Sequence, residues 1–173
     1  MQRLFFSLKF STAQQQQLLP YQQQVLKLCP DAKAVDTDNL HLTLFFLSQT
    51  DSEQQQRLSS AAEQIKLSAF SLTLDALSCF AKPKILYLAP SQLPDALLQL
   101  QQRVAQCCKA EGFSDIHDSY RPHITLARHA VCAEDCYRPV PPLIFNVTEF
   151  ALYCSKNSGS GVSYQPLTTF RLR

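Results

Sequence analysis

At 173 residues, with 46% hydrophobic and 10% aromatic residues, the chain is long enough to bury a core, and its composition excludes a disordered protein. The formal net charge of +2 excludes a broad basic surface, so a nucleic-acid partner would be contacted locally, at an end or a single nucleotide. No apolar run approaches the ~18 residues of a membrane span, so we expect no membrane partner.

The first half of the chain alternates predicted strands and helices. In chain order we expect a strand at 4–8, a helix at 11–29, a strand at 41–47, a helix from about 50 to 66, and strands at 70–76 and 85–89. Pro20 predicts a kink or a late start in the first helix. Thr50 and Glu53, three residues apart, predict a capping box at the start of the second helix.

The second half repeats the helix-then-strand order. We expect a helix at 93–110 stopped by Gly112, a strand at 123–128, a stiff connector at Pro139, Pro141 and Pro142, a strand at 144–152, a turn at 158–161 and a strand at 170–172. Strands outnumber helices, and helix–strand units recur. This order predicts an α+β fold with two antiparallel-rich sheets facing a central groove, and with helices on their outer faces.

Cysteine usage indicates the compartment. Seven cysteines form no framework spacing, and no signal peptide precedes the first predicted strand, so we expect reduced thiols and a cytoplasmic protein. His129, Cys132 and Cys136 have residue types that bind metals. Because no CxxC partner follows them, we predict no metal site.

One short motif, His-x-Thr-Leu with an apolar x, occurs twice, as His41-Leu42-Thr43-Leu44 and His123-Ile124-Thr125-Leu126. Side chains of a strand alternate between two faces, so His and Thr of each copy share one face. Two such strands side by side would gather two imidazoles and two hydroxyls over one groove. The copies lie 82 positions apart (123 minus 41), close to half the chain, which suggests an internal duplication. The ordinary alternative is two unrelated strands, each with a solvated His.

The copies diverge five residues after each His, where one has Phe46 and the other Arg128. Arg128 is the candidate cation for a phosphate, and Phe46 is a candidate for stacking on a base. Simple alternation turns Arg128 toward the Leu126 face, away from the groove, so a bulge or the strand end would have to re-aim it. A solvated strand end is the ordinary alternative for Arg128. Core packing is the interpretation that the residues alone favour for Phe46.

Two imidazoles in one cavity suit general acid–base chemistry. A neutral His takes a proton from water, and a protonated His gives one to a leaving oxygen. The Thr hydroxyls can donate to nonbridging phosphoryl oxygens while a cation balances the charge of the transition state. This division of labour requires no metal. A strained cyclic phosphodiester is a natural substrate, because in-line attack by water opens its ring.

At these residues the chain resembles the 2H phosphoesterases, which are named for two His-x-Thr motifs. More narrowly, it is similar to the bacterial and archaeal RNA 2′,3′-cyclic phosphodiesterases, long called 2′-5′ RNA ligases. The resemblance extends over nearly the whole chain, and the residues that carry it are 3–6, 38–47, 121–128 and 152–155, with Tyr164, Leu167 and Phe170. Ser48 departs from the family, which usually has Gly there.

The resemblance implies one domain, 1–173, made of two interleaved lobes related by a pseudo-two-fold axis, with one motif in each lobe. It implies hydrolysis of an RNA-terminal 2′,3′-cyclic phosphate to a 2′-phosphate, without a cofactor. His41 would donate the proton to the leaving 3′ oxygen, and His123 would accept one from water. The remaining residues implied in the site, as phosphate ligands, are Thr43, Thr125 and Arg128.

The expected partner is an RNA 3′ end or a small cyclic nucleotide, and the expected state is a monomer. Two alternatives remain open. The same site run in reverse would join RNA ends by a 2′-5′ linkage, drawing on the cyclic ester because no ATP-binding motif is present. A noncatalytic nucleotide- or RNA-binding module is the alternative of another class, although binding alone would not require both His-Thr pairs.

Overall fold

The structure, a computed structural model, describes residues 1–131, 137–159 and 161–173. Within these ranges the strands form two antiparallel sheets, one of four strands in the order β3-β1-β8-β9 and one of five in the order β2-β6-β5-β4-β7. The strands are β1 (Gln2–Leu8), β2 (Lys33–Ala34), β3 (Thr43–Thr50), β4 (Phe70–Phe80), β5 (Ile85–Ala89), β6 (Ile124–Arg128), β7 (Arg138–Val147), β8 (Glu149–Ser158) and β9 (Gly161–Arg171). The predicted α+β class is confirmed.

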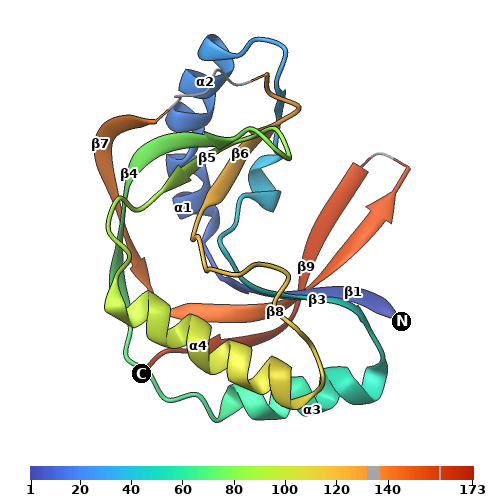
Figure 1. Cartoon of the computed structure of the whole chain (residues 1–173). Coiled ribbons are helices and arrows are strands. Elements are labelled where there is room, and N and C mark those ends of the chain that lie inside the picture. Colours follow the sequence, from blue (N-terminus) through green and yellow to red (C-terminus); the bar gives the residue numbers. More distant parts are fainter. Residues whose placement is uncertain (132–136, 160) are drawn as a thin grey trace.

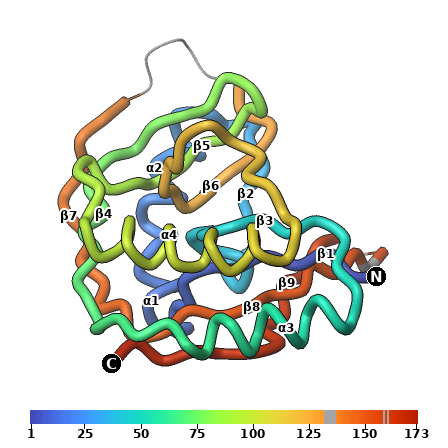
Figure 2. The backbone as a smooth tube through the Cα atoms, turned by 60° about the horizontal axis from the view of Figure 1, so that its bottom comes forward, coloured from blue at the N-terminus to red at the C-terminus, as the bar shows by residue number. Residues whose placement is uncertain are grey.

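Helices pack on both sheets. They are α1 (Thr12–Gln17), α2 (Leu19–Leu28), the short 3-10 helix η1 (Thr37–Asn39), α3 (Ser52–Glu63) and α4 (Asp95–Ala110). Figures 1 and 2 show α3 and α4 side by side across one face of the four-stranded sheet, while α2 packs on β6 of the other sheet. No helix in the described ranges has the length and apolarity to cross a membrane.

Strand β1 shows how the sequence divides its side chains between the core and the opposite face. Leu4, Phe6 and Leu8 are buried in the main hydrophobic cluster. Phe5 lies between them, so alternation places it on the other face, where its ring contacts other aromatic rings. One face of the four-stranded sheet therefore packs against helices, and the other is left to form a site.

The helix predicted at 11–29 is divided into α1 and α2, as Pro20 predicted. Ser11 caps α1 through a capping box, accepting from the Gln14 backbone N–H at 3.2 Å while its own N–H donates to Gln14 Oε1 at 2.9 Å. Pro20 stands in the first turn of α2, where a helix does not need its missing N–H. The start that Pro20 predicted is therefore the start of α2, and a separate short helix, α1, precedes it.

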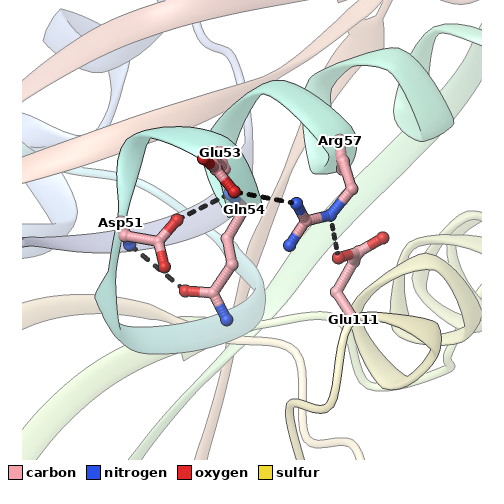
Figure 3. Close-up of polar contacts among 5 residues, drawn as sticks. All are labelled: Asp51, Glu53, Gln54, Arg57 and Glu111. Carbon is pink, nitrogen blue, oxygen red and sulfur yellow. Dashed lines mark hydrogen bonds and ion pairs between the residues drawn. The ribbon is translucent and has the colours of Figure 1, made fainter.

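The capping box of α3 is displaced by one residue from the predicted pair Thr50 and Glu53. Asp51 is the cap, and its Oδ1 accepts from the Gln54 N–H at 2.8 Å, while the Asp51 N–H donates to Gln54 Oε1 at 3.2 Å (Figure 3). Thr50 is instead the last residue of β3, paired with Gln2. Pairing in the sheet therefore decides between two neighbouring residues that both make good caps.

Arg57 joins α3 to the end of α4. Its Nε donates to Glu111 Oε2 at 2.7 Å, and its Nη1 lies 3.8 Å from Glu53 Oε2 one turn earlier (Figure 3). Glu111 caps the C-terminus of α4, and Gly112 follows with φ +86°, a conformation that favours glycine. The predicted stop at Gly112 is confirmed, whereas α3 ends at Glu63, short of the predicted residue 66.

The proline-rich segment is a strand and not the connector that we predicted. Pro139, Pro141 and Pro142 lie in β7, which is the edge of the five-stranded sheet and pairs on one side with β4. An edge strand tolerates prolines because its outward N–H groups have no ladder partner to lose. Tyr21 fixes this edge by donating from its hydroxyl to the Pro141 carbonyl at 2.7 Å.

The single strand predicted at 144–152 is also wrong. The chain leaves the five-stranded sheet at Val147 and enters the four-stranded sheet at Glu149. Both sides of this crossing are half-buried strands, so their apolar alternation looks continuous in the sequence. The last strand is longer than predicted, because β9 pairs with β8 along its length and forms a hairpin that projects from the sheet (Figure 1).

The cysteines differ in part from the expectation that all thiols are reduced. Cys79 on β4 is disulfide-bonded. The other described cysteines are free, and they are Cys29, Cys107, Cys108 and Cys154. Burial raises the pKa of the Cys107 and Cys108 thiols on α4. The remaining two, Cys132 and Cys136, lie outside the described residues.

Candidate active site

The two motif segments meet at an antiparallel bridge between Leu42 and Ile124. Both side chains are fully buried. In an antiparallel register centred on this pair, the residue before each one lies opposite the residue after the other. These flanking residues project to the other face and are half-buried, namely His41, Thr43, His123 and Thr125. The structure thus brings the predicted imidazoles and hydroxyls together where the two sheets join.

Both strands then carry a β-bulge at the same place in the repeat. The pairing of β3 with β1 skips Leu44, and the pairing of β6 with β5 skips Leu126. Each Thr is followed by two buried residues and then an exposed one, which is Phe46 in the first copy and Arg128 in the second. Because each bulge adds one residue, the alternation shifts by one, and the fifth residue after each His lies on the same face as that His. The bulge in β6 is therefore the device that turns Arg128 toward the groove.

The bulge in β6 is fixed by buried polar contacts. Gln22 of α2 donates from Nε2 to the Leu126 carbonyl at 2.9 Å and to the Val35 carbonyl at 2.7 Å. The Val35 N–H also donates to the Leu126 carbonyl, at 2.9 Å. Gln22 is one of the few buried polar residues in the described ranges, and here it gives the Leu126 carbonyl at the bulge a second donor.

The two imidazoles are held in the same way. Nδ1 of His41 lies 2.6 Å from the Asn39 carbonyl, and Nδ1 of His123 lies 2.7 Å from the Arg121 carbonyl. A carbonyl oxygen only accepts, so each Nδ1 carries the hydrogen and donates it. In the neutral ring Nε2 is then the free base, and both copies offer the nitrogen that acid–base catalysis uses.

His41 lies in an aromatic environment. Its ring centroid is 5.1 Å from that of Phe5 and 4.8 Å from that of Tyr164, which meets it edge-on. Burial lowers the pKa of His41 to about 4, with smaller lowering from the charges of Arg128 and His123, while the hydrogen bond to the Asn39 carbonyl raises it. His41 is therefore neutral at pH 7 when the site holds no anion.

His123 has its own aromatic neighbours from the other sheet. Phe80 meets it edge-on at 5.1 Å between ring centroids, and Tyr87 lies at 5.4 Å. Burial lowers the pKa of His123 as well, the hydrogen bond to the Arg121 carbonyl raises it, and the charges of His117 and Arg128 lower it. The charge of Arg128 thus reaches both imidazoles, so an anion beside Arg128 would raise the pKa of both.

Phe46 is not a core residue, which overturns the interpretation that the residues alone favoured. Its side chain is 46% exposed, and its ring lies 6.1 Å from the Phe5 ring. Phe5 is almost fully buried and stacks on Tyr153 at 5.4 Å. The aromatic group formed by Phe5, Phe46, Tyr153 and Tyr164 therefore ends in one exposed ring that is available to a ligand.

Two residues that hold the site were not identified from the sequence. Asn39 donates from Nδ2 to the Val162 carbonyl at 2.6 Å and accepts at Oδ1 from the Tyr164 N–H at 3.1 Å. It thereby ties η1 and the His41 ring to β9. Tyr120 donates from its hydroxyl to the Thr43 carbonyl at 3.0 Å, linking the approach to the second motif to the first. The sequence feature that could have identified Asn39 is its position two residues before His41.

A metal site finds no support in the described ranges, where no group of three or more His, Cys, Asp or Glu side chains could hold an ion. His129, the described member of the weak candidate set, is exposed and has φ +60°. The catalytic and phosphate-binding roles assigned above to the His, Thr and Arg residues remain predictions.

Known proteins match this chain over nearly its whole length. The family described as the 2′-5′ RNA ligase superfamily matches residues 19–159. The RNA 2′,3′-cyclic phosphodiesterase of Escherichia coli strain K12 is 33% identical, covering 99% of this chain and 97% of the relative. The protein of the same name from Thermotoga maritima is 25% identical, covering 95% and 92%.

Solved structures agree with the sequence match. The crystal structure of E. coli LigT complexed with 3′-AMP has a TM-score of 0.87 at 31% identity, covering 99% of this chain and 98% of that one. A structure described as a phosphoesterase has a TM-score of 0.85 at 30% identity, covering 99% of both chains. The chain belongs to the 2′-5′ RNA ligase superfamily, within the 2H phosphoesterases.

Proposed function

We propose that this protein is an RNA 2′,3′-cyclic phosphodiesterase that opens a terminal 2′,3′-cyclic phosphate to a 2′-phosphate. The observation that carries the proposal is the pairing of the two motifs at the Leu42–Ile124 bridge, with both imidazoles in the same tautomer and both influenced by the charge of Arg128. The names of the E. coli and T. maritima relatives support the same activity.

The proposed reaction uses each imidazole once. His123 accepts a proton at Nε2 as a water oxygen attacks phosphorus, and the bond between phosphorus and the 3′ oxygen breaks. His41 gives a proton from Nε2 to that leaving oxygen. Each turnover leaves the two protonation states exchanged, and solvent resets them. The acid must be protonated at the start, and the negative charge of the bound phosphate raises the His41 pKa from about 4 toward neutrality.

The phosphate ligands come from both copies of the repeat. Thr43 and Thr125 donate from their hydroxyls to nonbridging oxygens, and the Arg128 guanidinium balances the charge that develops in the transition state. Phe46 stacks on the base of the terminal nucleotide, which gives a near-symmetric groove one direction of binding. Because each sheet supplies one motif, we propose that residues 1–173 act as one domain with two lobes.

The proposed partner is an RNA 3′ end or a small cyclic nucleotide, met by a monomer in the cytoplasm. The reason for proposing a monomer is that the residues of one chain suffice for every role in the proposed reaction. Analytical ultracentrifugation and cell fractionation test these two statements. A dimer that buries the groove, or a protein found outside the cytoplasm, would contradict them.

The decisive experiment supplies a nucleoside 2′,3′-cyclic phosphate in the presence of EDTA and identifies the product isomer. The proposal expects a 2′-phosphate. Changing His41→Ala or His123→Ala should lower turnover by about 10²–10⁴. The matched control is His129→Asn, which changes an exposed His and keeps a residue that tolerates positive φ.

Three results would count against the proposal. Either His variant could retain activity within about tenfold of the wild type, or the product could be the 3′-phosphate. The third is nucleotide binding without turnover that survives loss of both His, which would favour a binding module. Incubation of matched RNA halves, followed by analysis of the linkage, tests 2′-5′ ligation by the same site.

A further inference from the structure

The groove-facing side of the four-stranded sheet extends beyond the aromatic group. Strand β1 pairs with β8 without interruption, so Arg3 shares the face of Phe5 while Leu4 points into the core. Along this face Ser7 pairs with Thr43 of the first motif, and Phe5 comes next. Arg3 is therefore one further step away from the motif, roughly 6–7 Å past Phe5 at two residues of strand rise.

Polar side chains stand on both sides of Arg3. Gln49 of β3 and Ser155 of β8 are its partners in the sheet. Arg3 and Gln49 are exposed, and Ser155 is half-buried. Within the described ranges Arg3 forms no ion pair with a carboxylate. The guanidinium is therefore available to an anion, with an amide and a hydroxyl beside it as further donors.

We propose that Arg3, Gln49 and Ser155 form a second phosphate-binding subsite, which takes the phosphodiester on the 5′ oxygen of the terminal nucleotide. The inference rests on the proposed function, which places the cyclic phosphate between His41 and His123. The terminal base then lies against Phe46, and the strand leads along β1 toward Arg3. A single cation here suits a chain of net charge +2 that contacts RNA locally.

The subsite makes the protein prefer an RNA end to a free cyclic mononucleotide. A nucleoside 2′,3′-cyclic phosphate has no 5′-phosphate and does not reach Arg3, whereas a dinucleotide with the same end does. The experiment compares kcat/KM for adenosine 2′,3′-cyclic phosphate and for the dinucleotide ApA ending in a 2′,3′-cyclic phosphate. We expect the wild type to favour the dinucleotide by about tenfold, mainly through KM.

Arg3→Gln should remove this preference and leave hydrolysis of the mononucleotide within about twofold. The slope of log KM against log salt concentration for the dinucleotide should fall by about 0.7, the value for one phosphate contact on a single strand. Arg103→Gln is the matched control, because it removes an equal charge from an exposed position on α4, behind the sheet. It should keep the preference.

Several results would overturn the subsite. In the first, Arg3→Gln lowers kcat/KM equally for the mononucleotide and the dinucleotide. In the second, Arg3→Gln keeps the preference for the dinucleotide, and in the third the wild type shows no such preference. Binding of the noncleavable dinucleotide ApA 3′-phosphate, followed by fluorescence anisotropy, separates the two proposals. If the wild type does not hydrolyse the cyclic ends but binds this probe through Arg3, the activity is wrong and the subsite stands. If it hydrolyses them while Arg3→Gln binds the probe as well as the wild type, the subsite is wrong.

Discussion

The burial of His41 predicts that this residue makes a pH-dependent contribution to stability. Its pKa falls from an ordinary value near 6.5 to about 4 in the folded protein. Between these values the unfolded chain binds a proton that the folded chain does not, so the free energy of unfolding falls as pH falls. The stability is fully present above pH 6.5, and its loss is complete below pH 4.

The expected size follows from the two pKa values. Over the interval from pH 7 to pH 4.5, proton binding to the unfolded state costs about 2 kcal/mol at this single site. His41→Gln keeps a polar side chain of similar size and removes the titration. The wild type should therefore lose about 2 kcal/mol more than His41→Gln over the same interval.

Urea denaturation at the two pH values measures this difference, provided that unfolding is two-state. His129→Asn should behave like the wild type, because it removes an exposed His. NMR titration of the His41 ring gives an independent measurement, with a midpoint near pH 4 that moves upward when inorganic phosphate is added. Equal losses in the wild type and in His41→Gln, or a His41 midpoint near 6.5 without phosphate, would refute the reasoning.

Three further predictions concern the residues around the motifs. Asn39→Ala removes both hydrogen bonds to β9 and should raise the His41 pKa, because a less firmly covered imidazole is less buried. Since His41 is the proposed acid, the alkaline limb of the kcat profile should shift to higher pH; an unshifted limb would contradict this. Tyr120→Phe leaves the fold but loses the bond to the Thr43 carbonyl, and urea denaturation should show a loss of about 1–2 kcal/mol. Phe46→Ala should raise KM for a cyclic nucleotide about tenfold, through lost stacking, yet leave a base-free ribose cyclic phosphate unaffected.

The sequence predicted the parts of the fold that depend on local pattern. The predicted strand at 85–89 coincides with β5, and the two His-x-Thr motifs lie where β3 and β6 begin. The repeat also located the divergent pair Phe46 and Arg128, and it showed that a bulge or a strand end was needed to aim the arginine. Periodicity succeeds here because each segment packs one face against the core.

The errors arise where distant contacts decide the local structure. Prolines in β7 are compatible with a strand only because β7 is an edge, and sheet order is not visible in a local window. Thr50 and Asp51 are both good helix caps, and pairing of Thr50 with Gln2 selects Asp51. The rings around the two His, such as Tyr164 and Tyr87, come from remote strands and carry no motif of their own.

The matched bulges at Leu44 and Leu126 allow a residue to be held by strand backbone without its side chain being packed in the core. In a regular strand, the fifth residue after each His would belong to the packed interior, and its identity would be constrained by the core. With one extra residue that position becomes free to vary, while hydrogen-bonded backbone still holds it firmly. A duplicated segment could therefore acquire an aromatic ring in one copy and a cation in the other without repacking either half.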